Sequence, residues 1–266
     1  MSIRHYTPRR RRHGLSGRSK LALGGTLGLT IALQMSYPLV DGDVLRFITI
    51  ASVYCGALAM LLHAFLSYGT KYLLRYFIST VLFGYFIELI GVHTGWPFGV
   101  YQYSDTLGLQ LFEVPLVVPF AWVMMVHPVL VAARAITKKW TFLYGGALLA
   151  AWDLFLDPQM VSAGRWTWEV TGAHVPFTPD IPLSNLFGWL LAGLTITAFL
   201  NVILPFDRRK EHASLSAVTI LLSWVLFSGL VGNLFFFDRQ GLALFASAIL
   251  GVLVAPFIFK STLGES

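Results

Sequence analysis

Residues 241–259 read GLALFASAILGVLVAPFIF, and this stretch contains no charged side chain. A helix that crosses a bilayer needs about 20 consecutive apolar residues, so the stretch is long enough to cross. Similar windows precede it, at 21–40, 44–66, 73–92, 113–136, 140–157, 183–205 and 215–237. The window at 140–157 is short and contains two acidic residues, so its hydropathy alone supports it least. The sequence therefore predicts an all-α, polytopic helical membrane protein with about eight transmembrane helices.

The composition of the chain agrees with this fold class. Of its 266 residues, 56% are hydrophobic and only 12% are charged, whereas soluble domains are about a quarter charged. A single cysteine excludes an intramolecular disulfide framework and any cysteine-rich metal site. We expect a basic tail at 1–20, one transmembrane helical domain at 21–260 and a short tail at 261–266.

The distribution of basic residues predicts the orientation in the membrane. With the N-terminus inside, 16 of the 19 Lys and Arg residues fall on the inner face and three on the outer face. This asymmetry follows the positive-inside rule and predicts a multi-pass protein of the cell membrane with both termini cytoplasmic. The first apolar segment is expected to remain as an uncleaved helix. We expect the arginine-rich tail to bind anionic lipid, and we do not expect a nucleic acid partner.

Three acidic residues lie inside predicted spans, where ionisable side chains are costly and usually functional. They are Glu88, Asp153 and Asp157, and all fall near the predicted outer face. Asp153 and Asp157 are four residues apart, so they share one helix face and lie about 6 Å apart along its axis. Burial and mutual repulsion oppose two negative charges there, so one of the two carboxyl groups is expected to hold a proton. Buried hydrogen bonding without catalysis is the structural alternative for these acids.

Glu88 lies between two glycines, and aromatic residues are frequent near all three acids. Gly84 and Gly91 are expected to let a neighbouring helix approach closely. An interfacial belt would explain the aromatic residues, and so would an aromatic pocket that holds an apolar ligand and stabilises a carbocation through ring faces. The sequence leaves both readings open. The aromatic candidates are Trp96, Phe98, Tyr101, Tyr103, Trp152, Trp166, Trp168 and Trp189.

Motifs for metal, nucleotide or serine hydrolase chemistry do not occur in the sequence. The seven histidines are at least eight residues apart, unlike the histidine boxes of membrane di-iron enzymes. Walker A, GxSxG and Rossmann glycine patterns are missing as well, so we expect no cofactor and no metal. Acids and aromatic residues at membrane depth suggest acid–base chemistry on a lipid, which is one possibility among several.

Four runs of polar, aromatic and glycine residues lie in the middle of the chain: ELIGVHTGWPFGVYQY at 88–103, AWDLFLDPQM at 151–160, WTW at 166–168 and PLSNLFGW at 182–189. Together these runs resemble the bacterial and archaeal carotenoid biosynthesis protein family. The resemblance covers roughly residues 80–205. This family includes hydratases that add water to the terminal double bond of acyclic carotenoid end groups, as in γ-carotene or bisanhydrobacterioruberin.

The resemblance implies a membrane-embedded carotenoid hydratase that forms a tertiary alcohol through a tertiary carbocation without a cofactor. Asp153 or Asp157 would donate the proton and Glu88 would position or deprotonate water. Trp152, Trp166 or Trp168 would flank the cation, while Asn185, Tyr101 and Tyr103 would orient polar groups. A carotenoid within the bilayer would be the substrate, and other carotenoid-modifying enzymes are possible partners. The alternatives are a carotenoid isomerase or cyclase that uses the same acids, a non-catalytic carotenoid carrier or scaffold, and a proton-coupled transporter.

Overall fold

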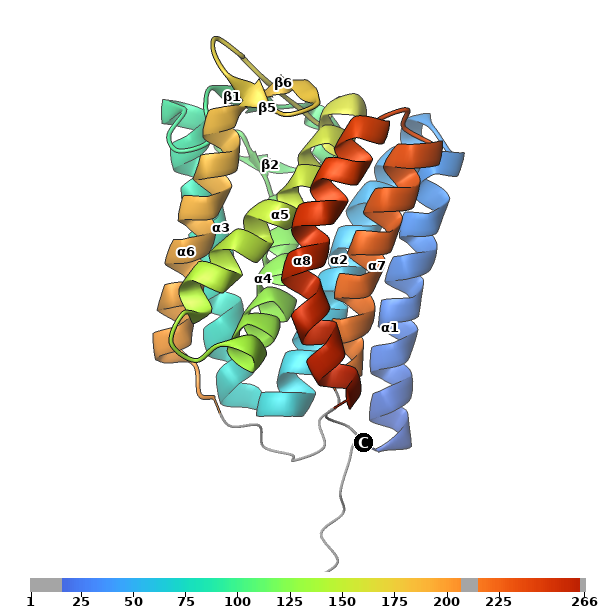
Figure 1. The fold of residues 1–266 in the computed structure, drawn as a ribbon, viewed down its shortest axis with the longest axis vertical. Coiled ribbons are helices and arrows are strands. Elements are labelled where there is room, and N and C mark those ends of the chain that lie inside the picture. The colour runs from blue at the N-terminus through green and yellow to red at the C-terminus, as the bar shows by residue number, and fades with distance from the viewer. Residues whose placement is uncertain (1–15, 207–214, 264–266) are drawn as a thin grey trace, which may run out of the picture.

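The computed structural model describes residues 16–206 and 215–263, and within them the chain forms eight long α-helices (Figure 1). The helices are α1 (Gly17–Ser36), α2 (Gly42–Tyr68), α3 (Thr70–Thr94), α4 (Val117–Ile136), α5 (Thr141–Ser162), α6 (Leu183–Ile203), α7 (Ser216–Phe235) and α8 (Gln240–Leu263). Six of them, all except α1 and α5, are long and apolar enough to cross a membrane. The prediction of an all-α, multi-pass membrane protein is confirmed.

The helices run alternately up and down along the long axis of the bundle. The start of α1 and the end of α8 lie at one end of the bundle, and short β-strands lie at the other, which we call the strand end (Figure 1). The even number of helices explains why the first and last helix ends share one end. Which end faces the cytoplasm stays a prediction, and so does the lipid contact predicted for the tail at 1–20, of which residues 1–15 lie outside the described residues.

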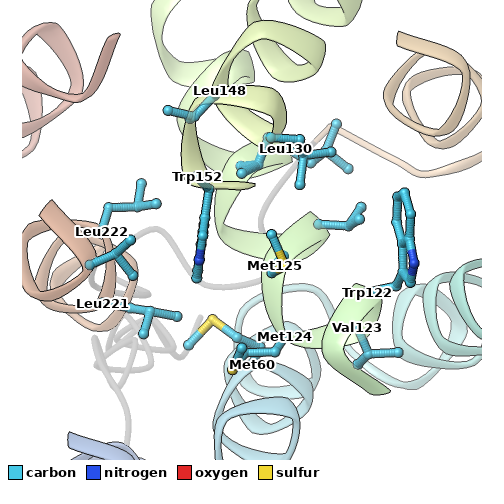
Figure 2. Packing of buried hydrophobic residues seen from close by; sticks show 14 of the residues in the cluster. Met60, Trp122, Val123, Met124, Met125, Leu130, Leu148, Trp152, Leu221 and Leu222 are labelled. Carbon is cyan, nitrogen blue, oxygen red and sulfur yellow. The ribbon is translucent and has the colours of Figure 1, made fainter. Parts of the chain in front are cut away.

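The centre of the bundle is formed by α4 and α5, whose residues are mostly buried by the other helices. Figure 2 shows Trp122, Met124 and Met125 of α4 among side chains contributed by α2, α5 and α7. The interior position of α5 explains why its acidic residues need not face lipid. Helix α6 packs closely against α5, since a Cβ atom on Gly193 would lie 2.9 Å from the Cα atom of Gly146.

Six short strands and two 3₁₀ turns occupy the connections at the strand end. The turns are η1 (Tyr37–Leu39) and η2 (Asp105–Leu107), and the strands are β1 (Tyr101–Tyr103), β2 (Gln110–Leu111), β3 (Val114–Pro115), β4 (Trp166–Trp168), β5 (His174–Val175) and β6 (Thr178–Pro182). The strands form three antiparallel pairs, β1 with β4, β2 with β3 and β5 with β6. The pairing of β1 with β4 joins two connections that are far apart in the sequence.

Four predicted windows have a boundary that is wrong by four residues or more: 21–40 against α1, 241–259 against α8, and the windows that correspond to α5 and α4. The window at 140–157 ends too early, because α5 continues through Pro158 to Ser162. Asp157 therefore lies more than one turn before the end of the helix. The window at 113–136 begins too early, because residues 114–115 form strand β3 before α4 begins at Val117. At α5 the helix continues through Pro158, which suggests an earlier end, and the true end is followed by Gly164 at a φ of 64°.

Candidate active site

The carboxyl group of Glu88 is the polar centre of the site. Glu88 lies on α3 and is 4% exposed. The hydroxyl groups of Tyr101 and Tyr103 donate hydrogen bonds to its Oε2 atom, at 2.5 and 2.8 Å, and the indole Nε1 of Trp122 donates to Oε1 at 3.1 Å. A carboxylate has about four acceptor positions, so three donors leave one position for a further partner.

The two glycines on α3 make room for the donors of Glu88. A Cβ atom on Gly84 would lie 2.8 Å from the indole of Trp122, and one on Gly91 would lie 2.6 Å from the hydroxyl of Tyr101. Both distances are too short for ordinary contact. The predicted close approach of a neighbouring helix is confirmed at Gly84, where α4 is the neighbour, whereas at Gly91 the neighbours are Phe98 and Tyr101 of the connection that contains β1.

The β1–β4 pair places two tyrosines and two tryptophans on one face above the acids. Its register sets Tyr101 opposite Trp168 and Tyr103 opposite Trp166. Alternate residues of a strand point to the same face, so the YQY and WTW patterns direct all four rings the same way. Burial, and then the nearby carboxyl group of Glu88, raises the pKa of the Tyr101 and Tyr103 hydroxyls. Both phenols therefore remain protonated donors to Glu88 at neutral pH.

A second acidic group is formed by Asp153 and Asp157 on α5 together with Asn185 on α6. The amide Nδ2 of Asn185 donates to Oδ2 of Asp153 at 3.2 Å and also to Oδ2 of Asp157. All three side chains are at most 3% exposed. One amide thus holds two carboxyl groups together, an arrangement in which the pair can share a proton.

A cavity of about 70 Å³ lies between Glu88 and Asp157. Both carboxyl groups and Asn185 line it, and aromatic rings form much of its remaining wall. The indoles of Trp122 and Trp189 stack with centroids 4.7 Å apart, and the ring of Phe98 lies 6.0 Å from that of Trp189. We call this space the acid cavity.

Nine of the twelve site residues predicted from the sequence line the acid cavity. They are Glu88, Phe98, Tyr101, Tyr103, Asp157, Trp166, Trp168, Asn185 and Trp189. Asp153 lies behind them, held by Asn185. Trp152 lines a neighbouring cavity instead. Trp96 is 56% exposed and lines neither cavity, so the structure does not bring it to the site.

Two residues that hold the acids in place were missed by the sequence reasoning. Trp122 donates to Glu88, but an isolated tryptophan in an apolar helix gives no sequence signal of such a role. Arg239, which precedes α8, donates to the carbonyl of Pro158 and to the hydroxyl of Ser162. These bonds fix the last turn of α5, next to Asp157, and no motif marks the arginine. The sequence reasoning also missed eight further residues that line the acid cavity: Thr49, Val53, Leu107, Val117, Val118, Ala121, Leu156 and Met160.

The described residues contain no group of three or more His, Cys, Asp or Glu side chains that could hold a metal ion. The polar groups around the acid cavity are carboxyl, phenol, amide and indole groups. This set can transfer protons and orient water.

Comparison with known proteins agrees with the chemistry of this site. The model of a family described as carotenoid biosynthesis protein matches residues 48–255. The chain belongs to this family. The family expected from the sequence motifs is thereby confirmed, and its matched region contains every residue of the acid cavity.

One characterised relative is the bisanhydrobacterioruberin hydratase of Haloarcula japonica. It is 32% identical over 170 residues, which cover 60% of this chain and 55% of the relative. The chain therefore matches only about half the length of that hydratase. No solved structure matches the chain.

Proposed function

We propose that this carotenoid biosynthesis protein is a hydratase that adds water across the terminal double bond of an acyclic carotenoid end group. The observation that carries this function is the acid cavity, in which carboxyl groups from two helices, Glu88 of α3 and Asp157 of α5, face one small space with aromatic walls. The hydratase name of the relative from Haloarcula japonica supports the same reaction class.

The first step is protonation of the double bond by Asp157. Asp157 lines the acid cavity, whereas Asp153 does not line it. The amide of Asn185 donates a hydrogen bond to each of the two carboxyl groups. The proton of the Asp157 carboxyl group forms the new C–H bond with the π electrons of the alkene. A tertiary carbocation remains at the neighbouring carbon, and Asp157 becomes a carboxylate that Asn185 stabilises.

The second step is capture of the cation by water, with Glu88 as the base. Three donors leave one acceptor position on Glu88 for a water hydrogen. The water oxygen bonds to the cationic carbon, and Glu88 takes the released proton. Return of that proton to Asp157 completes the cycle, so the net change is addition of one water molecule.

Two buried polar atoms in the wall of the acid cavity are available to orient the water or the product hydroxyl. Oδ1 of Asn185 and Nε1 of Trp166 have no hydrogen-bond partner among the described residues. Buried polar atoms are nearly always paired in native proteins. Their concentration beside Asp157 supports a polar ligand at this point of the cavity.

Expression in a host that accumulates acyclic carotenoids tests the reaction directly. We expect the extracted pigment to gain the mass of one water molecule per reacted end. An unchanged mass with altered retention would indicate an isomerase or cyclase instead. Pigment that is bound by the purified protein but chemically unchanged would indicate the non-catalytic carrier.

The aromatic wall gives a graded prediction at Trp189. A ring face near a cation contributes about 0.5–2 kcal/mol, so Trp189→Leu is expected to lower the hydration rate by about 2-fold to 30-fold. Trp189→Phe keeps a ring face, so it is expected to lower the hydration rate much less. Initial rates from the mass of the product test this difference, and equal losses in both variants would indicate packing rather than cation stabilisation.

A further inference from the structure

A second and larger cavity lies next to the acid cavity. Its volume is about 390 Å³, and its walls come from α2, α4, α5, α7 and residues 34–39, which end α1 and form η1 and which we call the α1–η1 segment. The two cavities share four lining residues, Thr49, Val53, Leu156 and Met160. They are therefore adjacent, and we call the larger one the side cavity.

The side cavity reaches the lipid-facing surface of the bundle. Several of its lining side chains are large, apolar and exposed, including Met35 at 58%, Leu39 at 71% and Phe227 at 57%. They belong to α1, η1 and α7, and α1 and α7 lie at one edge of the bundle (Figure 1). In a multi-pass membrane protein such apolar side chains face acyl chains, so the opening leads sideways into the bilayer.

The interior of the side cavity is suited to a flat, apolar chain. Rings of Trp152, Phe155 and Phe237 line it, and a Cβ atom on Gly229 would lie 2.7 Å from the ring of Phe155. The glycine thus leaves space for that ring. The polar side chains among the walls include Trp224, whose indole donates to Gln34 at 2.6 Å, so both polar groups have a partner.

The volumes of the two cavities suit different parts of one ligand. The acid cavity, at about 70 Å³, has room for an end group and a little water. The side cavity, at about 390 Å³, falls within the usual range of about 300–1,000 Å³ for small-molecule sites. A long carotenoid with its end in the acid cavity must continue somewhere, and the shared wall points to the side cavity.

We propose that the side cavity binds the conjugated polyene chain of the carotenoid and admits it laterally from the bilayer between the α1–η1 segment and α7. This inference rests on the proposed function only for the identity of the ligand. The end group enters first and stops between Glu88 and Asp157, while the polyene lies along the rings of α5 and α7. The remaining part of the molecule stays in the lipid.

Ser228 on α7 offers a way to block the side cavity without touching the acids. Its side chain lines the cavity and is partly buried. We expect Ser228→Trp to lower hydration of a long acyclic carotenoid by about tenfold or more, while a ten-carbon acyclic isoprenoid with the same end group reacts as before. Ser223→Trp is the matched control, because Ser223 lies on the same helix and lines neither cavity.

The experiment separates the two proposals. Equal loss with both substrate lengths, or no loss with either, would overturn the role of the side cavity but not the hydratase. If the unaltered protein hydrates neither substrate, the hydratase fails, and pigment retention by the purified protein then tests the cavity alone. Polyene binding in the side cavity would be overturned if the Ser228→Trp variant retained as much pigment as the unaltered protein. It would also be overturned if the variant lost bound phospholipid instead of pigment. If the Ser228→Trp variant does not fold, Val231→Phe replaces it in the experiment, because Val231 lines the same cavity and the change adds less volume.

Discussion

Replacing Asp157 with asparagine is expected to lower the hydration rate by about 10²-fold to 10⁴-fold, the usual contribution of a general acid. Asparagine has the same shape as aspartate but cannot supply the proton that forms the new C–H bond. Its amide can still bond to Asn185, so the fold should persist. The measurement is the rate of product formation in membranes, with the amount of folded protein determined alongside.

The neighbouring acids provide the controls for Asp157→Asn. Asp105→Asn changes an exposed acid at the strand end and should leave the rate unchanged. Asp153→Asn should lower the hydration rate less than Asp157→Asn does, because Asp153 does not line the acid cavity. It should also shift the pH profile of the rate. A larger loss at Asp153 than at Asp157 would reverse the assignment of the donor.

Much of the fold and part of the site follow from local sequence signals. Uninterrupted apolar stretches such as 241–259 predict helices because the bilayer leaves the backbone no other way to satisfy its hydrogen bonds. Glu88, Asp153 and Asp157 are conspicuous because charge is scarce in these stretches. Their grouping at one end of the bundle follows from the alternating direction of the helices.

The remaining parts of the site depend on contacts between distant segments. The pairing of β1 with β4 cannot be predicted from either short strand, since a three-residue strand carries too little pattern to specify a partner. The spacing of the histidines in the sequence likewise does not predict which of them lie close together in the fold. His63 and His127 are far apart in the sequence, yet their Nδ1 and Nε2 atoms lie 2.9 Å apart between α2 and α4.

Replacing Glu88 with glutamine is expected to abolish most hydration and also to destabilise the protein. Tyr101, Tyr103 and Trp122 all donate to the carboxyl group. The single amide oxygen of glutamine has two acceptor positions, so at least one of the three donors loses its acceptor. An unpaired buried group costs about 1–3 kcal/mol in the free energy of unfolding. Thermal unfolding in detergent measures the stability change, and the product assay measures the rate.

The loss of activity and the loss of stability can be separated by removing a donor. Trp122→Phe removes one of the three donors, so the two acceptor positions of the glutamine oxygen can serve Tyr101 and Tyr103. Relative to Trp122→Phe alone, the double variant Glu88→Gln/Trp122→Phe should recover stability but remain inactive if Glu88 is the base that deprotonates water. Recovery of both would mean that Glu88 acts only by holding the tyrosines of β1 in place. Since the phenols of Tyr101 and Tyr103 can rotate, the indole is the donor whose direction the backbone fixes, which makes it the informative partner to remove.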